Sequence, residues 1–299
     1  MNKVYLDNAA TTALSDEVID AMVDVMKFNF GNPSSTHSFG QESKAIIEGV
    51  RRTVADALKV QPNEIIFTSC GTESNNLIIK GCVEFLGVER IITSPLEHKC
   101  VAESVRDMKN RRGVEVVYIR PDKKGDITVE ALEKALQASE KKTLVTLMHA
   151  NNEVGNIYDI DGFGHLCQKY NAYFHSDTVQ TVAHLDLDFS KTPIDFASCS
   201  AHKFHGPKGS GFAFIRKNTR LKGMISGGTQ ERELRAGTEN VTGIVGLGKA
   251  LDLCVTHLDE YANSIQEIKD YAIEQLKLHI PDVRFNGRSS EKENSLFTL

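Results

Sequence analysis

The sequence predicts an α/β fold with a mainly parallel central sheet, helices on both faces of that sheet, and a small α+β domain at the C-terminal end. Two observations lead to this fold class. Helical periodicity and short β-rich runs alternate from about residue 15 onward, as expected when each strand is followed by a crossover helix. The 299 residues, of which 40% are hydrophobic, suffice for one large domain and a smaller one.

Local signals place the individual elements in chain order. Ser15 is a suitable N-cap for the amphipathic helix that follows it, and the polar stretch GNPSSTHSFG is expected to form a loop. We expect helices at residues 15–26, 41–60, 72–86, 100–112, 128–139, 163–170 and 258–280. We expect strands at residues 64–69, 90–94, 114–119, 143–150, 172–177, 195–200 and 211–216.

The pattern changes near residue 258 and suggests a division into two domains. Residues 14–258 are expected to form the large domain, and residues 1–13 and 259–299 the small one. The last six residues, NSLFTL, read as the start of a strand, and an apolar strand is normally paired within a sheet. We therefore expect that a C-terminal part of the small domain is missing from this polypeptide.

Composition excludes several classes of function. The net charge of -5 and the lack of a Lys/Arg stripe argue against nucleic acid as a partner. No run approaches the 18 or so apolar residues of a membrane span, and the N-terminus lacks the apolar core of a signal peptide, so the expected location is the cytoplasm. The six cysteines form no C-x-x-C pair, which argues against a metal site and a disulfide framework.

The stretch FTSCGTESNN is the first candidate site. A strand runs into a turn of small residues, and a helix begins near Thr72. Free backbone N–H groups at that helix start suit a phosphate, and the Thr72 hydroxyl can add a hydrogen bond. The alternative is a tight turn in which Thr72 only caps the helix.

The second candidate is HSDTVQ, where Asp177 ends a strand at the edge at which open α/β sheets bind ligands. A carboxylate there can hold a proton on a ring nitrogen, and Gln180 can reach the same ligand. Asp at a strand end is also a common helix cap, so this stretch alone leaves both interpretations open.

The third candidate is SCSAHKFHGPKGSGF, which places Lys203 at the end of the next strand. A lysine held among small residues loses solvation of its ammonium form, so its pKa falls and the free amine can attack an aldehyde. This is the Schiff-base chemistry of pyridoxal phosphate (PLP). Together the three candidates supply, on three successive ligand-facing strand ends, the phosphate cradle, carboxylate and lysine that PLP requires. Lys208 is the competing lysine, and a solvated loop position for Lys203 is the structural alternative.

The chain resembles the cysteine desulfurases of the class V aminotransferase-like group over almost all of its length. The motifs that carry the resemblance are, in family order, YLDNAATT, GNPSSTHSFG, TSCGTESNN, PLEHKC, NNEVGNIYDI, HSDTVQ, SAHKFHGPKGSG and GGTQERELRAGTEN. The resemblance implies the PLP-dependent transferase fold of type I and a homodimer with active sites at the subunit interface.

The resemblance also implies roles for individual residues. Lys203 is expected to bind PLP covalently, Asp177 to pair with the pyridine nitrogen, and His98 to stack on the ring and move protons. The remaining cofactor-binding residues are expected to be Gly71, Thr72, Asn152, Gln180, Ser200 and His202, with Thr238 contributed by the other subunit.

The implied reaction converts L-cysteine to L-alanine and passes the sulfur, as a persulfide, to an acceptor or scaffold protein for iron–sulfur clusters or thiolation. The family's nucleophilic cysteine and its carboxylate-binding arginine would both lie beyond Leu299, and none of the six cysteines has the expected Ser/Gly-rich setting. Sulfur transfer by this polypeptide is therefore in question. Three alternatives remain: a selenocysteine lyase, another class V lyase or aminotransferase, or a non-catalytic scaffold of sulfur assembly.

Overall fold

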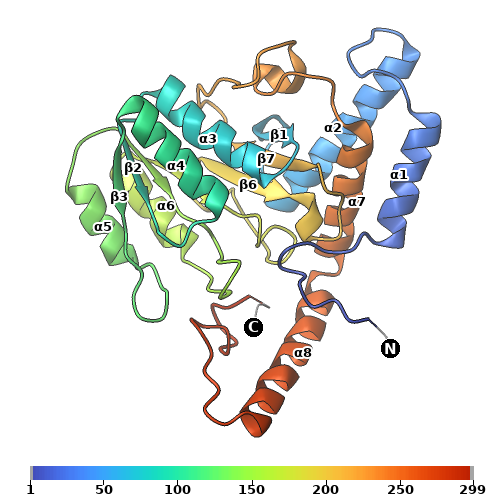
Figure 1. Cartoon of the computed structure of the whole chain (residues 1–299). Coiled ribbons are helices and arrows are strands. Elements are labelled where there is room, and N and C mark those ends of the chain that lie inside the picture. Colours follow the sequence, from blue (N-terminus) through green and yellow to red (C-terminus); the bar gives the residue numbers. More distant parts are fainter. Residues whose placement is uncertain (1–2, 297–299) are drawn as a thin grey trace.

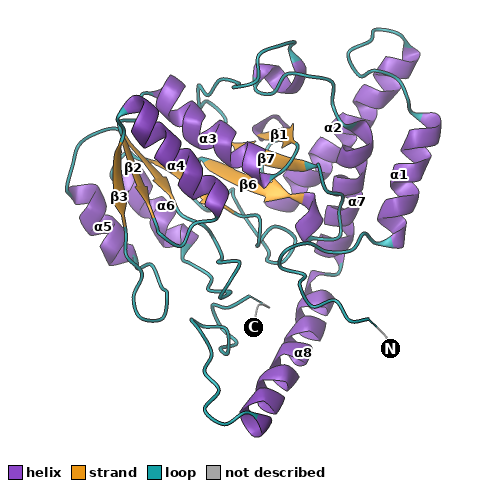
Figure 2. Ribbon diagram, in the orientation of Figure 1, coloured by secondary structure: helices purple, strands orange, loops and turns teal. Residues whose placement is uncertain are grey.

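The computed structural model describes residues 3–296, and its helices surround a single central sheet (Figures 1 and 2). The helices are α1 Asp16–Phe28, α2 Ser38–Leu58, α3 Gly71–Leu86, α4 Lys99–Arg112, α5 Val129–Gln137, α6 Ile160–Lys169, α7 Val241–Thr256 and α8 Leu258–His279. The strands are β1 Ile65–Thr68, β2 Arg90–Thr93, β3 Glu115–Tyr118, β4 Thr143–Thr146, β5 Tyr173–Asp177, β6 Phe196–Ser200 and β7 Gly211–Ile215. The predicted α/β fold class is confirmed.

The sheet has seven strands in the order β1-β7-β6-β5-β4-β2-β3. The neighbouring strands β3, β2, β4, β5 and β6 are parallel to one another. Strand β7 runs antiparallel to both of its neighbours, β1 and β6. The sequence placed Thr72, Asp177 and Lys203 at three successive strand ends. That expectation was wrong in one respect, because β7 lies between the strands that precede Thr72 and Lys203.

Two apolar layers cover the two faces of the sheet. Successive side chains of a strand point to opposite faces, so Phe212 and Phe214 join one core cluster while Ala213 and Ile215 join the other. The first cluster packs against α2, α5, α6 and α7, and the second against α3 and α4. This arrangement buries both faces of the sheet, so the candidate ligand sites lie at the ends of its strands.

The local signals for the elements hold with small shifts in their bounds. Ser15 caps α1 by accepting a hydrogen bond from the Val18 N–H, as its position before an amphipathic run predicted. The strand expected at residues 143–150 ends at Thr146. Beyond it, the His149 backbone N–H still donates to the Asp177 backbone carbonyl of β5 at 3.0 Å. Helix α7 was not assigned from the sequence.

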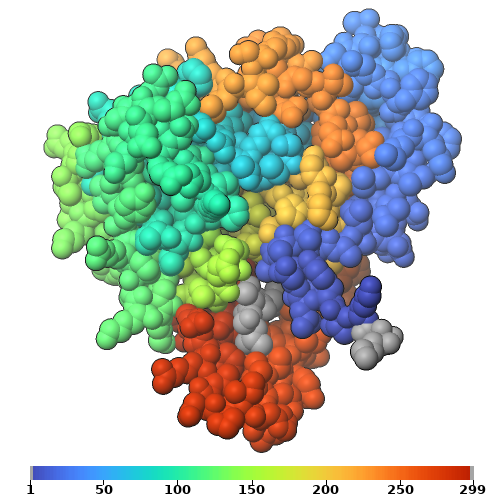
Figure 3. Space-filling model, viewed as in Figure 1, coloured from blue at the N-terminus to red at the C-terminus, as the bar shows by residue number. Residues whose placement is uncertain are grey.

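The C-terminal part of the chain is dominated by α8, which extends away from the sheet (Figure 1) and forms the lower part of the molecule with the segment after it (Figure 3). Residues 280–296 form no further helix or strand, and Ser295 makes an isolated bridge to Asn156. The rest of the strand expected at NSLFTL, residues 297–299, lies outside the described residues. The division into domains at residue 258 stays a prediction.

No helix in the described part of the chain is, on its own, both long and apolar enough to cross a membrane. Helices α7 and α8 pass that test only as a pair, by length and composition, and they are bent by 75° relative to each other.

Candidate active site

A pocket of about 440 Å³ lies where the carboxyl ends of β1, β5 and β6 meet the N-terminal segment. Nine of the ten predicted site residues line it: Gly71, Thr72, His98, Asn152, Asp177, Gln180, Ser200, His202 and Lys203. The tenth, Thr238, is exposed and lies outside the pocket lining. The folded chain therefore gathers residues that are up to 132 positions apart in the sequence, from 71 to 203.

Strand β7 allows the ends of β1 and β6 to approach each other although it separates them. Its first residue, Gly211, pairs with Thr68 on one side and with Ser200 on the other. A Cβ at Gly211 would lie 2.4 Å from the Cys199 carbonyl oxygen and 3.0 Å from Cys70 Cα. Only glycine fits this position, and its small size keeps the candidate phosphate turn beside the lysine-bearing turn.

The turn before α3 leaves polar groups available to a ligand. The N-cap of α3 is Cys70, not Thr72, and the Cys70 side chain makes no capping hydrogen bond. Ser200, which is 2% exposed, lines the pocket, and its Oγ has no hydrogen-bond partner among the described residues. A Cβ at Gly71 would lie 2.5 Å from Val179 Cγ2. Helix N–H groups and an unpaired buried hydroxyl suit an anionic group such as phosphate.

Lys203 follows β6 in the short 3-10 helix Ala201–Lys203, and its side chain is half-buried in the pocket. Its Nζ donates hydrogen bonds to the carbonyl oxygens of Ala9, at 2.5 Å, and Ala10, at 2.9 Å. Burial lowers the pKa of Lys203, and the charges of Asp177 and Asp7 oppose this shift without cancelling it. A lowered pKa makes the uncharged amine more accessible, as nucleophilic attack on an aldehyde requires.

The competing lysine lies elsewhere. Lys208 is exposed and is not part of the pocket lining. Its solvated position is the one expected for an ordinary loop lysine.

Asp177 is 6% exposed and holds its carboxylate in a fixed orientation at the end of β5. Its Oδ1 accepts the Val179 backbone N–H at 3.0 Å, and its Oδ2 accepts Asn75 Nδ2 at 2.8 Å. The carboxylate thus supports a local turn, and no helix begins there. Each oxygen keeps acceptor capacity for a ligand N–H, because a carboxylate oxygen has two lone pairs.

The N-terminal segment contributes lining residues to which the sequence assigned no role, although they belong to the quoted motif YLDNAATT. Asp7, Ala9 and Ala10 line the pocket. Gln180 donates its Nε2 hydrogen to the Ala9 carbonyl at 3.1 Å, and the Thr12 N–H donates to the His202 carbonyl at 2.9 Å. These bonds attach the first residues of the chain to the lysine-bearing turn.

Asn75 and Cys100 also line the pocket, and sequence reasoning missed both as site residues. Asn75 is fully buried in the second turn of α3 and follows Thr72 at the i,i+3 spacing that places two side chains on one helix face. That spacing was the available signal for Asn75. Cys100 is the second residue of α4, two positions after His98, and its Sγ lies 2.9 Å from His98 Nδ1.

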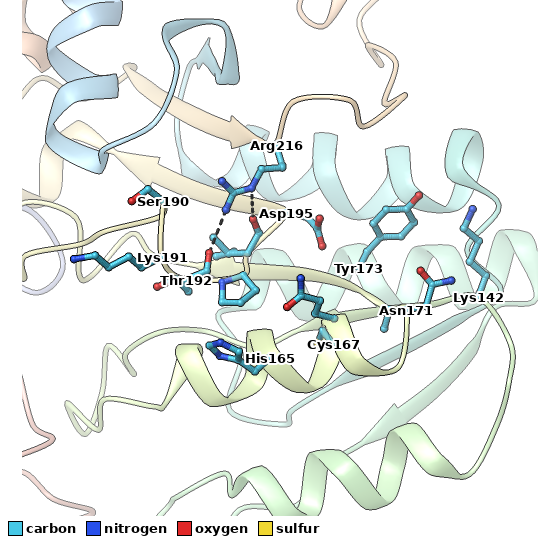
Figure 4. A pocket seen from close by; sticks show the side chains of 14 residues that line it. Lys142, His165, Cys167, Asn171, Tyr173, Ser190, Lys191, Thr192, Asp195 and Arg216 are labelled. Carbon is cyan, nitrogen blue, oxygen red and sulfur yellow. Dashed lines mark hydrogen bonds between the residues drawn. The ribbon is translucent and has the colours of Figure 1, made fainter.

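A second cavity, of about 630 Å³, lies at the opposite edge of the sheet near the first residues of β5 and β6 (Figure 4). Arg216 lines this cavity. Its Nε donates a hydrogen bond to the Ile194 carbonyl, and its Nη2 donates to the carbonyls of Phe189 and Thr192. This guanidinium therefore supports the loop before β6. The smaller pocket contains the half-buried Lys203, the Asp177 carboxylate and the unpartnered Ser200 hydroxyl, so we assign the active site there.

Comparisons with known proteins identify the family of the chain. The family model described as aminotransferase class-V matches residues 4–299. The chain is 44% identical over 297 residues to the cysteine desulfurase IscS of Dictyoglomus turgidum, covering 98% of this chain and 75% of that protein.

Two solved structures are also similar. A NifS-like protein aligns with a TM-score of 0.89 and 40% identity, over 92% of this chain and 76% of that one. A structure described as SspA in complex with cysteine aligns with a TM-score of 0.79 and 36% identity, over 84% and 72% of the two chains. The chain therefore belongs to the class V aminotransferase family and is similar within it to the IscS-type cysteine desulfurases.

Proposed function

We propose that this chain belongs to a PLP-dependent cysteine desulfurase, an enzyme that converts L-cysteine to L-alanine and passes the sulfur, as a persulfide, to an acceptor thiol. The observation that carries the proposal is the half-buried Lys203 amine, with its lowered pKa, in one pocket with Asp177. Membership of the class V family implies PLP as the cofactor. The relatives named cysteine desulfurase and the cysteine-bound structural neighbour support cysteine as the substrate.

The residues of the pocket fit this cofactor. The free helix start of α3 and the unpartnered Ser200 hydroxyl suit its phosphate, with Thr72 and His202 adding donors. Asp177 suits the pyridine nitrogen, and Asn152 and Gln180 suit the phenolic oxygen. When bound, PLP supplies an electron sink that stabilises negative charge on the substrate carbons.

The chain's own groups then bind, orient and move protons. Lys203 holds the cofactor through its Nζ, and its lowered pKa makes it a suitable proton acceptor and donor at the substrate Cα. Asp177 keeps a proton on the ring nitrogen through its fixed carboxylate. His98, exposed at the start of α4, is placed to give or take protons on the open side of the pocket.

We assign the sulfur-accepting role to none of the six cysteines. Burial raises the pKa of Cys82, Cys100, Cys167, Cys199 and Cys254. A protonated thiol is a poor nucleophile, so these five are unsuited to attack the substrate sulfur at neutral pH. Cys70 lies in the turn that we assign to the phosphate.

A homodimer is part of the same proposal. Thr238 is exposed and lies outside this chain's pocket, which suits a residue that reaches the partner's cofactor. Large apolar side chains are exposed on and after α1, including Met26, Phe28 and Phe30, and association would remove them from water. A sulfur-acceptor or iron–sulfur scaffold protein and a cytoplasmic location complete the proposal.

The test uses the protein encoded by the complete reading frame, loaded with PLP and given L-cysteine and a thiol reductant. Alanine and sulfide in equal amounts, formed only with PLP present, are the expected result. Alanine release much faster from selenocysteine than from cysteine would favour the selenocysteine lyase alternative. Bound PLP without conversion of either amino acid would refute the proposed reaction and support a scaffold that retains the fold.

A further inference from the structure

A chain of hydrogen bonds, exposed at His98 and buried at Asp177, connects these two residues through two side chains that the proposed reaction does not use. Cys100 Sγ lies 2.9 Å from His98 Nδ1 and 3.2 Å from Asn75 Nδ2. The same Asn75 nitrogen donates to Asp177 Oδ2 at 2.8 Å. All four residues line the candidate active site, and they come from α3, α4, the N-cap of α4 and β5.

The Asn75 amide has one possible orientation in this chain. Turning it over would bring its Oδ1 against the Asp177 carboxylate, and two acceptors would then face each other in a buried site. With Nδ2 in place, its two hydrogens reach Asp177 and Cys100. The sulfur therefore accepts a hydrogen bond from Asn75, and its own hydrogen is free to point toward His98.

His98 Nδ1 must then be an acceptor. The Cys100 backbone N–H also donates to this nitrogen, at 3.2 Å, and makes His98 the side-chain cap of α4, so the N–H and the thiol share its one lone pair. A hydrogen on Nδ1 would face that N–H and break the cap. The neutral ring is consequently expected to carry its proton on Nε2.

The state of the thiol agrees with this direction of the hydrogen bond. Burial raises the pKa of Cys100 to about 11, and the charge of Asp177 adds to that shift, while hydrogen bonds from Asn75 and Thr72 oppose it. At neutral pH the sulfur therefore keeps its hydrogen and can donate it.

We propose that Cys100 and Asn75 are positioning residues that lock His98 as the Nε2–H tautomer and connect it, through one hydrogen-bonded chain, to the Asp177 carboxylate. The proposal rests on the proposed function, which gives His98 its role in the active site. It concerns the protein's own side chains, so it can be measured without cofactor. Nothing in the catalytic role proposed for His98 requires a cysteine at position 100.

The first test measures the ¹⁵N chemical shifts of His98 in the cofactor-free protein labelled at histidine, with His98→Gln to assign the signals. The expected wild-type spectrum is that of a protonated Nε2 and an unprotonated Nδ1. Cys100→Ala should lower the ratio of Nε2–H to Nδ1–H tautomer about fivefold, the effect of one lost hydrogen bond, and Cys100→Ser should restore it. Cys70→Ala removes the other pocket thiol, which makes no bond to His98 within the described residues, and should change nothing.

A second measurement uses the wild-type chain, so it does not depend on how a variant folds. Alkylation of Cys100 by iodoacetamide, followed by mass spectrometry, should be slow at pH 7 and rise steeply toward pH 11. Fast alkylation at pH 7 would identify a thiolate beside an imidazolium and overturn the proposal. A wild-type Nδ1–H tautomer, or unchanged His98 shifts in Cys100→Ala, would overturn it as well.

Covalent capture of PLP separates the two proposals. If borohydride fixes PLP to wild-type Lys203 but the His98 tautomer ratio is the same in Cys100→Ala as in the wild type, this inference fails and the proposed function stands. If the tautomer behaves as expected but PLP is never captured, the proposed function fails and the positioning role stands.

Discussion

Replacing Glu231 by Gln should destabilise the protein strongly, because it breaks a buried ion pair. The Glu231 and Arg51 side chains are 2% and 3% exposed, and two N–H···O bonds of 2.7 and 2.8 Å join them. Glu231 Oε2 also accepts the Phe67 backbone N–H of β1 at 2.7 Å. Glu231 has a φ of 42°, so the ion pair holds a left-handed residue in place and attaches the segment that carries Thr238 to β1.

The expected magnitude follows from the partners that remain. Breaking a buried pair costs about 3–5 kcal/mol because the other charge stays buried and unpaired. Arg51 would keep Glu48, at 3.1 Å, and the Ile65 carbonyl, at 2.7 Å, so we expect the lower end of that range. A loss of about 3 kcal/mol corresponds to about 5 °C in Tm for a chain of 299 residues, whose unfolding entropy is about 0.6 kcal/mol/K.

The assay is urea and thermal unfolding at pH 7.5, with Glu84→Gln as the matched control. Glu84 pairs with Arg112 at 2.7 Å, but these side chains are 23% and 52% exposed, so the control should lose less than about 1 kcal/mol. Equal losses in Glu231→Gln and Glu84→Gln would refute the claim that burial makes the Arg51 pair essential.

Two further predictions concern packing and pH. Gly211→Ala should cost about 1–3 kcal/mol in urea unfolding, since its Cβ would overlap the Cys199 carbonyl, whereas Gly49→Ala, with open space in α2, should gain up to about 1 kcal/mol. A neutral or stabilising Gly211→Ala would contradict the close approach of β1 and β6. Burial lowers the pKa of His149 to about 4 and that of His175 to about 3. Below pH 6.5 the unfolded chain therefore binds protons that the folded one cannot. Stability should fall by about 1.4 kcal/mol per pH unit per histidine between pH 6.5 and 4, and a flat profile would contradict their neutral burial.

Much of the fold follows from local signals in the sequence. The cap at Ser15 and the short apolar strands were predictable because their signals lie within a few residues. Helix α7 was not, since its glycines obscure a helical pattern. A Cβ at Gly246 would lie 2.7 Å from Met22 Sδ, and one at Gly248 would lie 2.6 Å from Val50 Cγ1. These glycines allow α7 to pack closely against α1 and α2, a reason visible only in the folded chain.

The candidate site was predictable where a motif ends a strand and not where distant segments meet. Gly71, Asp177 and Lys203 were found because strand ends of an α/β sheet converge at one edge. The contact of Lys203 with Ala9 joins residues 194 positions apart, and no local pattern specifies it. The antiparallel insertion of β7 likewise depends on long-range pairing, which periodicity cannot reveal.

The most direct test of the account is the site at which the protein captures PLP. The purified chain is incubated with PLP, reduced with borohydride and digested, and the modified peptide is identified by mass spectrometry. We expect the pyridoxyl group on Lys203, its loss in a folded Lys203→Ala variant, and its retention in Lys208→Ala. Modification of Lys208 in place of Lys203, or no covalent capture by the wild-type chain, would contradict the assignment of this pocket as the active site.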